Sequence, residues 1–339
     1  MKRIFHSSII LIFFLLIYES AWCWGFYGHR KINYCSVFLL PPEMLVFYKP
    51  AIHFLTEHAV DPDKRRYIVP GEGPRHYIDL DRYGSYPYDS LPRQWKAAVA
   101  RYGEDSLLTH GIVPWQVQFM LTRLTTAFAE RNYGRILILS AELGHYIADA
   151  HVPLHTNSNH NGQFTNQKGI HAFWESRVPE LLAETNPFND GFDFIIGKAQ
   201  YIRNPGEFIW KRVMESAKAA DSVLKIEKEL SRRFPGDKKY AFEERNATPE
   251  NSNAPAKLIR QYSTAYTIAY NEKLNGMVER RMRMAIFSIA SFWFTAWVNA
   301  GQPNLKELSG RSFSPEDLVL FEKMDAEWKR SSLMIGRSE

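Results

Sequence analysis

The stretch from His145 to Glu175 constrains this chain more than any other part of its sequence. His145 and Asp149 are four residues apart, and so are His171 and Glu175. Residues at this spacing share one face of a helix. Imidazole nitrogen and carboxylate oxygen are the ligands that zinc takes where cysteine is absent. The two pairs therefore predict ligand-bearing helices.

A third histidine lies between the two pairs. His155 follows Pro153, and proline does not continue a helix cleanly, so we expect His155 where the backbone turns. A single His-x3-Asp pair would be interpreted as a solvated helix face or a core histidine. Three linked elements within one short stretch favour a metal site instead.

The N-terminus has the pattern of a secretory signal peptide. A basic start is followed by an apolar run from Ile9 to Tyr18 and by small residues at Ala21 and Cys23. The run is too short for a confident membrane span. We expect cleavage after Cys23, a mature chain that begins at Trp24, and a secreted or periplasmic protein. Bulky Trp22 disfavours a lipoprotein anchor at Cys23.

Composition limits the sources of stability. Hydrophobic residues make up 45% of the 339, enough for a sizeable core. Of the two cysteines only Cys35 would remain after cleavage, which excludes an internal disulfide. The net charge of +5 suits an anionic substrate but is weak support for one.

Helical patterns dominate, so the predicted fold is all-α, a single mainly helical domain with the metal cluster in a cleft between helices. Residues 284–298 are very apolar, and their short length favours a buried core helix over a membrane span. We expect signal peptide 1–23, catalytic domain 24–302 and a loosely packed C-terminal tail 303–339. The predicted helices and the exposed loop are Pro41–His58 with a kink at Pro50, Leu91–Tyr102, Pro114–Arg131, Tyr133–Ala150, Pro205–Arg233, Pro255–Lys273, Asn275–Ala300, and the loop Pro235–Asn253.

Further ligand-type residues lie upstream. The mature start WGFYGH brings Trp24 and His29 close together, and a free α-amino group is itself a nitrogen ligand. Asp61 lies fifteen residues before His76, with Asp63 as an alternative at nearly the same position. Helix starts and turns explain each of these residues equally well when it is considered alone.

Together, these motifs resemble those of the bacterial zinc-dependent phospholipases C and the related single-strand-specific zinc nucleases. The order is WGFYGH, then an aspartate before RHYIDLD, then HYIADAHVPLH and HAFWE, from Trp24 to Glu175. The helices beyond Glu175 agree only in type. The chain departs from the family in lacking the disulfides of the fungal nucleases and in its long tail after Pro303.

The resemblance implies three zinc ions per chain and a ligand set for each. Asp61, His76, His145 and Asp149 would hold the first ion, and spacing with the preceding Ala59-Val60 favours Asp61 over Asp63. His155, His171 and Glu175 would hold the second ion. Trp24, through its amino group and carbonyl, would hold the third with His29 and Asp149, so that Asp149 bridges two ions.

The implied activity is hydrolysis of a phosphate ester by zinc-bound hydroxide, with Asp61 and Asp149 as the catalytic carboxylates. The positive charge of three divalent ions exceeds the negative charge of Asp61, Asp149 and Glu175. The site would therefore stay positive, which favours a negatively charged phosphodiester as the substrate. No side-chain nucleophile is needed, no stable protein partner is implied, and we expect a monomer.

The substrate stays open between a phospholipid head group and single-stranded nucleic acid. Glu175 and the short gap from His155 to His171 favour phospholipase C, whereas the close spacing of Trp24 and His29 resembles the nucleases. A non-catalytic zinc-binding protein is a third alternative, for which His160 is the one extra ligand near the second set. Aromatic residues that could stack on a base or contact a quaternary ammonium group are Phe26, Tyr27, Tyr77, Tyr83, Tyr86 and Phe164.

Overall fold

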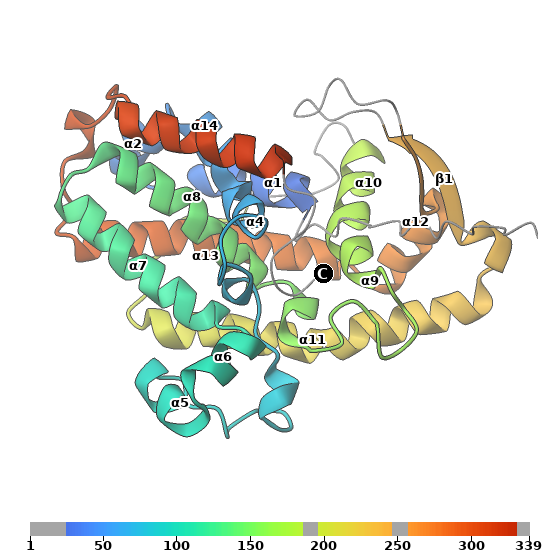
Figure 1. Cartoon of the computed structure of the whole chain (residues 1–339). Coiled ribbons are helices and arrows are strands. Elements are labelled where there is room, and N and C mark those ends of the chain that lie inside the picture. Colours follow the sequence, from blue (N-terminus) through green and yellow to red (C-terminus); the bar gives the residue numbers. More distant parts are fainter. Residues whose placement is uncertain (1–24, 186–195, 246–256, 331–339) are drawn as a thin grey trace, which may run out of the picture.

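The computed structural model describes residues 25–185, 196–245 and 257–330. The predicted signal peptide and Trp24 lie outside these ranges. The fold is mainly helical and forms a single all-α domain, as predicted, and it carries in addition one small β-hairpin (Figure 1).

The core is built around an antiparallel pair of helices, α7 (Val113–Ala129) and α8 (Tyr133–Asp149). The side chain of Asn132 caps α8 by accepting a hydrogen bond from the Arg135 amide, which fixes where this helix begins. Helix α13 (Met277–Asn299) packs against both helices and against α1 (Gly25–Val37). The long α11 (Pro205–Arg233) contacts α7 and lies below α13 in the view of Figure 1.

Helix α13 contains the apolar stretch 284–298, and most of its residues are buried in the core. The prediction of a buried core helix is therefore confirmed. Over the described ranges, no helix has both the length and the apolar character needed to cross a membrane.

The close approach of α1 and α8 depends on one glycine. A Cβ atom on Gly144 would come 2.9 Å from Cγ of Asn33, and closer still to its Oδ1. The Asn33 amide donates to the carbonyls of Leu55 and Ala141, both at 3.1 Å. This packing brings the next residue of α8, His145, against His29 of α1, with their rings stacked at 3.8 Å.

Most of the predicted helices are present, with adjusted ends. The segment predicted to kink at Pro50 forms two helices, α2 (Pro42–Tyr48) and α3 (Ile52–Glu57). The remaining elements are η1 (His58–Val60), α4 (Asp61–Arg65), η2 (Gly73–Arg75), η3 (Leu80–Tyr83), α5 (Trp95–Tyr102), α6 (Glu104–His110), η4 (Pro153–Thr156), α9 (Ile170–Ala172), the π-helical turn η5 (Phe173–Arg177), α10 (Val178–Thr185), η6 (Gly236–Lys238), α12 (Thr264–Lys273) and η8 (Leu305–Glu307).

Two predictions about the C-terminal half were wrong. The expected loop 235–253 contains strand β1 (Tyr240–Arg245), and the expected helix from Pro255 begins instead as strand β2 (Lys257–Tyr262), antiparallel to β1. Tyr240 lies opposite Tyr262, and the guanidinium of Arg260 stacks on the Tyr240 ring at 3.7 Å. These cross-strand side-chain contacts stabilise the hairpin, and the helical spacing of the sequence did not reveal them.

The tail was expected to pack loosely, but it contains a helix docked on the domain. Helix α14 (Pro315–Arg330) packs against α4, where Lys64 pairs with Asp325 at 2.7 Å. Phe321 packs against Phe54 and His58. Leu318, Val319 and Leu320 are apolar but exposed, so the apolar residues of this helix do not mark one buried face. For this reason the sequence did not indicate a packed helix.

Candidate metal centre

The structure brings ligand-type side chains from six segments into two adjoining groups. We call the first the Asp149 cluster and the second the Glu175 cluster. The Asp149 cluster consists of His29, Asp63, His76, His145 and Asp149, and the Glu175 cluster consists of His155, His171 and Glu175. All eight side chains are buried.

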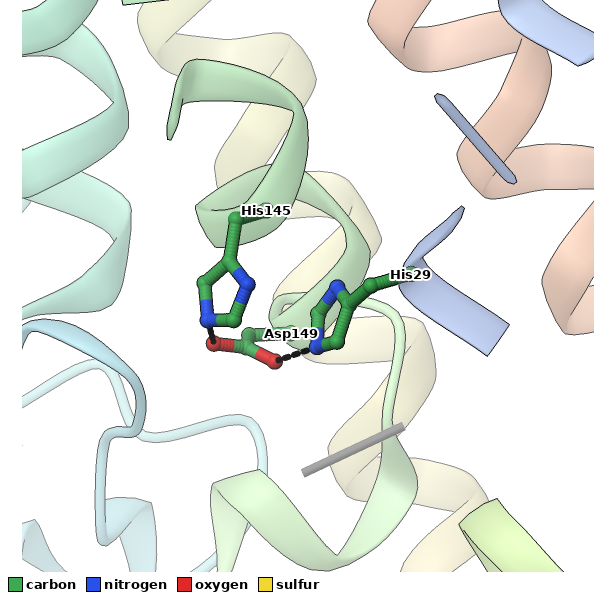
Figure 2. A group of neighbouring side chains, drawn as sticks. All are labelled: His29, His145 and Asp149. Atoms are coloured by element: carbon green, nitrogen blue, oxygen red, sulfur yellow. Dashed lines mark ion pairs between the residues drawn. The ribbon is translucent and has the colours of Figure 1, made fainter. Parts of the chain in front are cut away.

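Asp149 lies at the centre of its cluster. The two oxygens of its carboxylate are shared between two imidazoles, with Oδ2 3.2 Å from Nε2 of His145 and Oδ1 3.4 Å from Nε2 of His29 (Figure 2). His145 and Asp149 are one turn apart on α8, so the predicted common helix face is confirmed. Oδ2 also lies 2.9 Å from Nδ1 of His76.

Asp63, and not Asp61 as the motif spacing favoured, lies beside His76 and His145. Oδ1 of Asp63 lies 3.6 Å from Nε2 of His145 and 3.7 Å from Nδ1 of His76. Asp61 points elsewhere: it binds Nδ1 of His58 at 2.6 Å and Nζ of Lys64 at 3.4 Å. An α-helix rotates about 200° over two residues, so the two carboxylates leave α4 on opposite sides. The structure therefore groups Asp63, and not Asp61, with His76 and His145.

The Glu175 cluster is built by a turn and a short irregular helix. Oε2 of Glu175 lies 3.0 Å from Nε2 of His171 and 3.5 Å from Nε2 of His155. Nδ1 of His155 lies 3.7 Å from Oδ1 of Asp149, which connects the two clusters. His155 is on the turn η4, as its position after Pro153 predicted.

Hydrogen bonds to backbone carbonyls orient two of the imidazoles. Nδ1 of His145 donates to the Ala59 carbonyl at 2.8 Å, and Nδ1 of His155 donates to the His76 carbonyl at 2.7 Å. With Nδ1 protonated, each ring directs an unprotonated Nε2 toward its cluster. Contacts of this kind fix the tautomer of metal-binding histidines.

The residues fit a zinc ion. Zinc takes imidazole nitrogen and carboxylate oxygen at about 2.0–2.2 Å, so tetrahedral ligand atoms lie roughly 3.3–3.6 Å from one another. The separations between ligand atoms within the two clusters run from 2.9 to 4.0 Å and include this range. Both oxygens of Asp63 and both ring nitrogens of His29 are buried without a hydrogen bond to any described residue. Buried polar atoms of this kind are costly unless a ligand satisfies them.

The electrostatics also favour a cation. Burial opposes ionisation of Asp149, but the nearby imidazoles of His145 and His155 outweigh it and hold the pKa of this carboxyl well below its usual range. Burial opposes the charged form of His29 too and so lowers the pKa of this imidazole, and the nearby imidazole of His145 lowers the pKa further. Burial would lower the pKa of His76 too, but contacts with carboxylates, Asp149 first among them, raise it to about 9. Divalent metals displace protons from such ligands.

Two further histidines, His151 and His160, lie apart from the clusters. His151 hydrogen-bonds through Nδ1 to the Ile147 carbonyl at 2.7 Å and through Nε2 to Ser288 Oγ at 3.2 Å, so it faces the core and not the metal ligands. The ring of His160 lies 5.9 Å from that of His171, but His160 is not part of the Glu175 cluster. Trp24 lies outside the described residues.

The structure has a cavity beside α14, but this cavity is not the cleft that was predicted to hold the metal cluster. A cavity of about 210 Å³ lies between α14, α3, α4 and α8, and its mainly apolar lining includes Phe54, Phe321 and Met324. Asp61 contributes to this lining, whereas none of the eight clustered residues does.

Of the aromatic residues proposed to contact a substrate, some are buried and others are exposed. Tyr77 and Tyr83 are buried in the core region, as ordinary packing residues are. Phe26 packs on Trp328 of α14. Tyr86 and Phe164 are exposed, and Phe164, at 66%, lies on the segment between His155 and His171.

One residue near the site was missed by sequence reasoning. Glu72 is fully buried, and its Oε1 lies 3.6 Å from Nε2 of His76. The sequence contained a signal for this contact, because Glu72 and His76 have the same four-residue spacing as His145 and Asp149. Burial opposes ionisation of Glu72, but His76 and Arg65 together hold its pKa below the ordinary value.

Comparisons with known proteins do not add an identity. The sequence matches no protein-family model, and a search of curated proteins gives no match. The interpretation of the site therefore depends on its own geometry, which defines buried His/Asp/Glu clusters able to hold metal ions.

Proposed function

We propose that this chain is a zinc-dependent phosphodiesterase of the phospholipase C type. One observation carries the proposal: the oxygens of Asp149 are divided between two ligand sets, with Oδ2 2.9 Å from Nδ1 of His76 and Oδ1 3.4 Å from Nε2 of His29. A carboxylate between two adjoining ligand sets suits metal ions held close together, as in two-metal phosphoesterases. The motif order from Trp24 to Glu175 supports the same class, with three ions.

Zinc bound here would supply Lewis-acid polarisation of a phosphoryl oxygen and a source of hydroxide at neutral pH. The protein's part is to hold the ligands in place. The Asp149 cluster draws side chains from α1, α4, the segment after η2, and α8, all of them buried, so that little rearrangement accompanies metal binding. The Glu175 cluster has three protein ligands, which leaves a coordination position for a phosphate oxygen.

The mature protein is proposed to begin at Trp24, to be secreted or periplasmic, and to act as a monomer. The N-terminal amino group would then complete a ligand set with His29 and Asp149.

A single-strand-specific nuclease is the second candidate. The close spacing of Trp24 and His29 favours it, and the exposed ring of Phe164 offers a surface on which a base can stack. The same ring would serve a phospholipase by contacting a choline head group.

The deciding experiment uses the purified mature chain, with metal analysis followed by parallel assays. The substrates are phosphatidylcholine vesicles, single-stranded DNA and single-stranded RNA, and Asp149→Asn serves as the inactive control. Release of phosphocholine supports the lead proposal, and release of nucleotides with intact lipid supports the nuclease. A zinc-loaded chain that cleaves none of these would be a binding protein.

Phe164 permits a second comparison on whichever substrate is cleaved. We expect Phe164→Ala to raise KM several-fold with little change in kcat, because the ring contributes binding and no chemistry. Phe119→Ala is the matched control, since Phe119 is similarly exposed, at 58%, but lies on α7.

A further inference from the structure

Glu72 lies on the side of His76 that faces away from the metal ligands. The ring of His76 presents Nδ1 to the Asp149 cluster, 2.9 Å from Asp149 and 3.7 Å from Asp63. Its other nitrogen, Nε2, lies 3.6 Å from Oε1 of Glu72, a separation typical of an ion pair. Both residues are fully buried. The imidazole is thus held between prospective metal ligands on one edge and a carboxylate on the other.

We propose that Glu72 is a positioning residue: its carboxylate, 3.6 Å from Nε2 of His76, favours the tautomer protonated at Nε2 and so directs Nδ1 at the metal. A carboxylate in this place fixes the tautomer and orientation of the ring and makes its other nitrogen a better donor to metal. The inference requires that the Asp149 cluster binds metal, but it does not depend on which substrate is cleaved.

Glu72 is itself held by three donors. The hydroxyl of Tyr146 donates to Oε1, and Arg75 donates to Oε2 at 2.8 Å. Nε of Arg65 lies 3.4 Å from the same oxygen, Oε2. A carboxylate fastened in this way can keep a neighbouring ring in one orientation.

The same contacts join the segments that carry the ligands. Arg65 is on α4, two residues after Asp63, and binds Glu142 of α8 at 2.6 Å. Tyr146 is on α8 beside His145, and Glu72 immediately precedes η2. A single buried network therefore ties together the backbone segments that present Asp63, His76 and the two α8 ligands. A purely structural network would stabilise the fold without affecting metal affinity, and this difference can be measured.

The test compares Glu72→Gln with Glu142→Gln. Both variants neutralise a carboxylate bound to Arg65, but only the first changes a neighbour of His76. Zinc affinity is measured by competition with a chromogenic chelator, the absorption spectrum of the cobalt-substituted protein reports the ligand field, and thermal unfolding of the metal-free chains reports stability.

We expect Glu72→Gln to bind zinc about 10–100-fold more weakly than wild type and to shift the cobalt spectrum. Glu142→Gln should keep both properties, whatever its thermal stability. If Glu72→Gln does not fold, Glu72→Asp replaces it; the charge is kept but the carboxylate is withdrawn from His76, and a weaker affinity is again expected. Equal zinc affinities and cobalt spectra for wild type and the Glu72 variant would overturn the inference. If wild type itself holds no zinc, the proposed function fails as well.

Discussion

Asp61 and Asp63 lie two residues apart on α4, yet their carboxylates serve different parts of the molecule. Asp63 approaches His76 and His145, whereas Asp61 binds His58 and Lys64 on the side that faces α14. The pair offers a direct test of the ligand assignment, because the two substitutions are chemically identical.

Asp63→Asn should reduce zinc content and abolish most phosphodiester hydrolysis, since it removes a charged ligand from the Asp149 cluster. Asp61→Asn should keep its zinc and instead weaken the attachment of α14, through loss of the Lys64 contact. The measurement is zinc by atomic spectrometry on both purified variants. The reverse result, with metal lost only from Asp61→Asn, would restore the original assignment.

Asp149→Asn is expected to lose zinc and nearly all activity, because the two carboxylate oxygens of Asp149 face the ligand nitrogens of His29 and His145. The matched variant is His151→Asn, two residues along, which should retain most of its zinc. It should lower the free energy of unfolding by about 1–3 kcal/mol, because the buried partners Ser288 and the Ile147 carbonyl lose a hydrogen bond. Zinc content and chemical denaturation, measured together, distinguish the two effects.

Removal of metal should destabilise the whole domain. Ions that bind only the folded chain contribute about 4 kcal/mol when present at a thousand times Kd, which corresponds to a shift in Tm on the order of 5–10 °C. Treatment with a chelator, followed by calorimetry, should show this decrease, and added zinc should reverse it where magnesium does not. An unchanged Tm would mean that the clusters are stable without an ion.

Gly144→Ala should separate α1 from α8, because the added methyl group would meet Asn33. We expect a loss of about 1–3 kcal/mol in stability, as for other overpacked cores, and weaker zinc binding through displacement of His29 from His145. Gly236→Ala is the control, since nothing lies within 4 Å of the position where its Cβ would be. Equal stabilities for the two variants would show that the α1–α8 contact adapts freely.

Sequence spacing was most reliable where one regular helix carried the information. The i,i+4 pair His145 and Asp149 and the buried stretch in α13 depend only on helix geometry, and both are present in the structure. The assignment failed at α4, because Asp61 and Asp63 fit the same motif and only the three-dimensional packing decides which side of the helix faces the cluster.

The remaining errors involve contacts between distant segments. Hairpin β1–β2 depends on cross-strand partners such as Tyr240 and Tyr262, which local periodicity does not pair. The proposed role of Glu72 depends on the contact of its neighbour His76 with Asp149, which lies more than seventy residues from His76 in the sequence. A single sequence contains these residues but not their distances.

The two clusters differ in how much of the chain must be ordered before they can form. The Glu175 cluster uses residues from His155 to Glu175 only, so closing it confines one short loop. The Asp149 cluster requires segments from His29 to Asp149 to be packed first. We therefore expect metal to load in sequence, with the Glu175 cluster able to take an ion in a partly folded chain. Occupancy of the Asp149 cluster would then serve as a marker of completed folding.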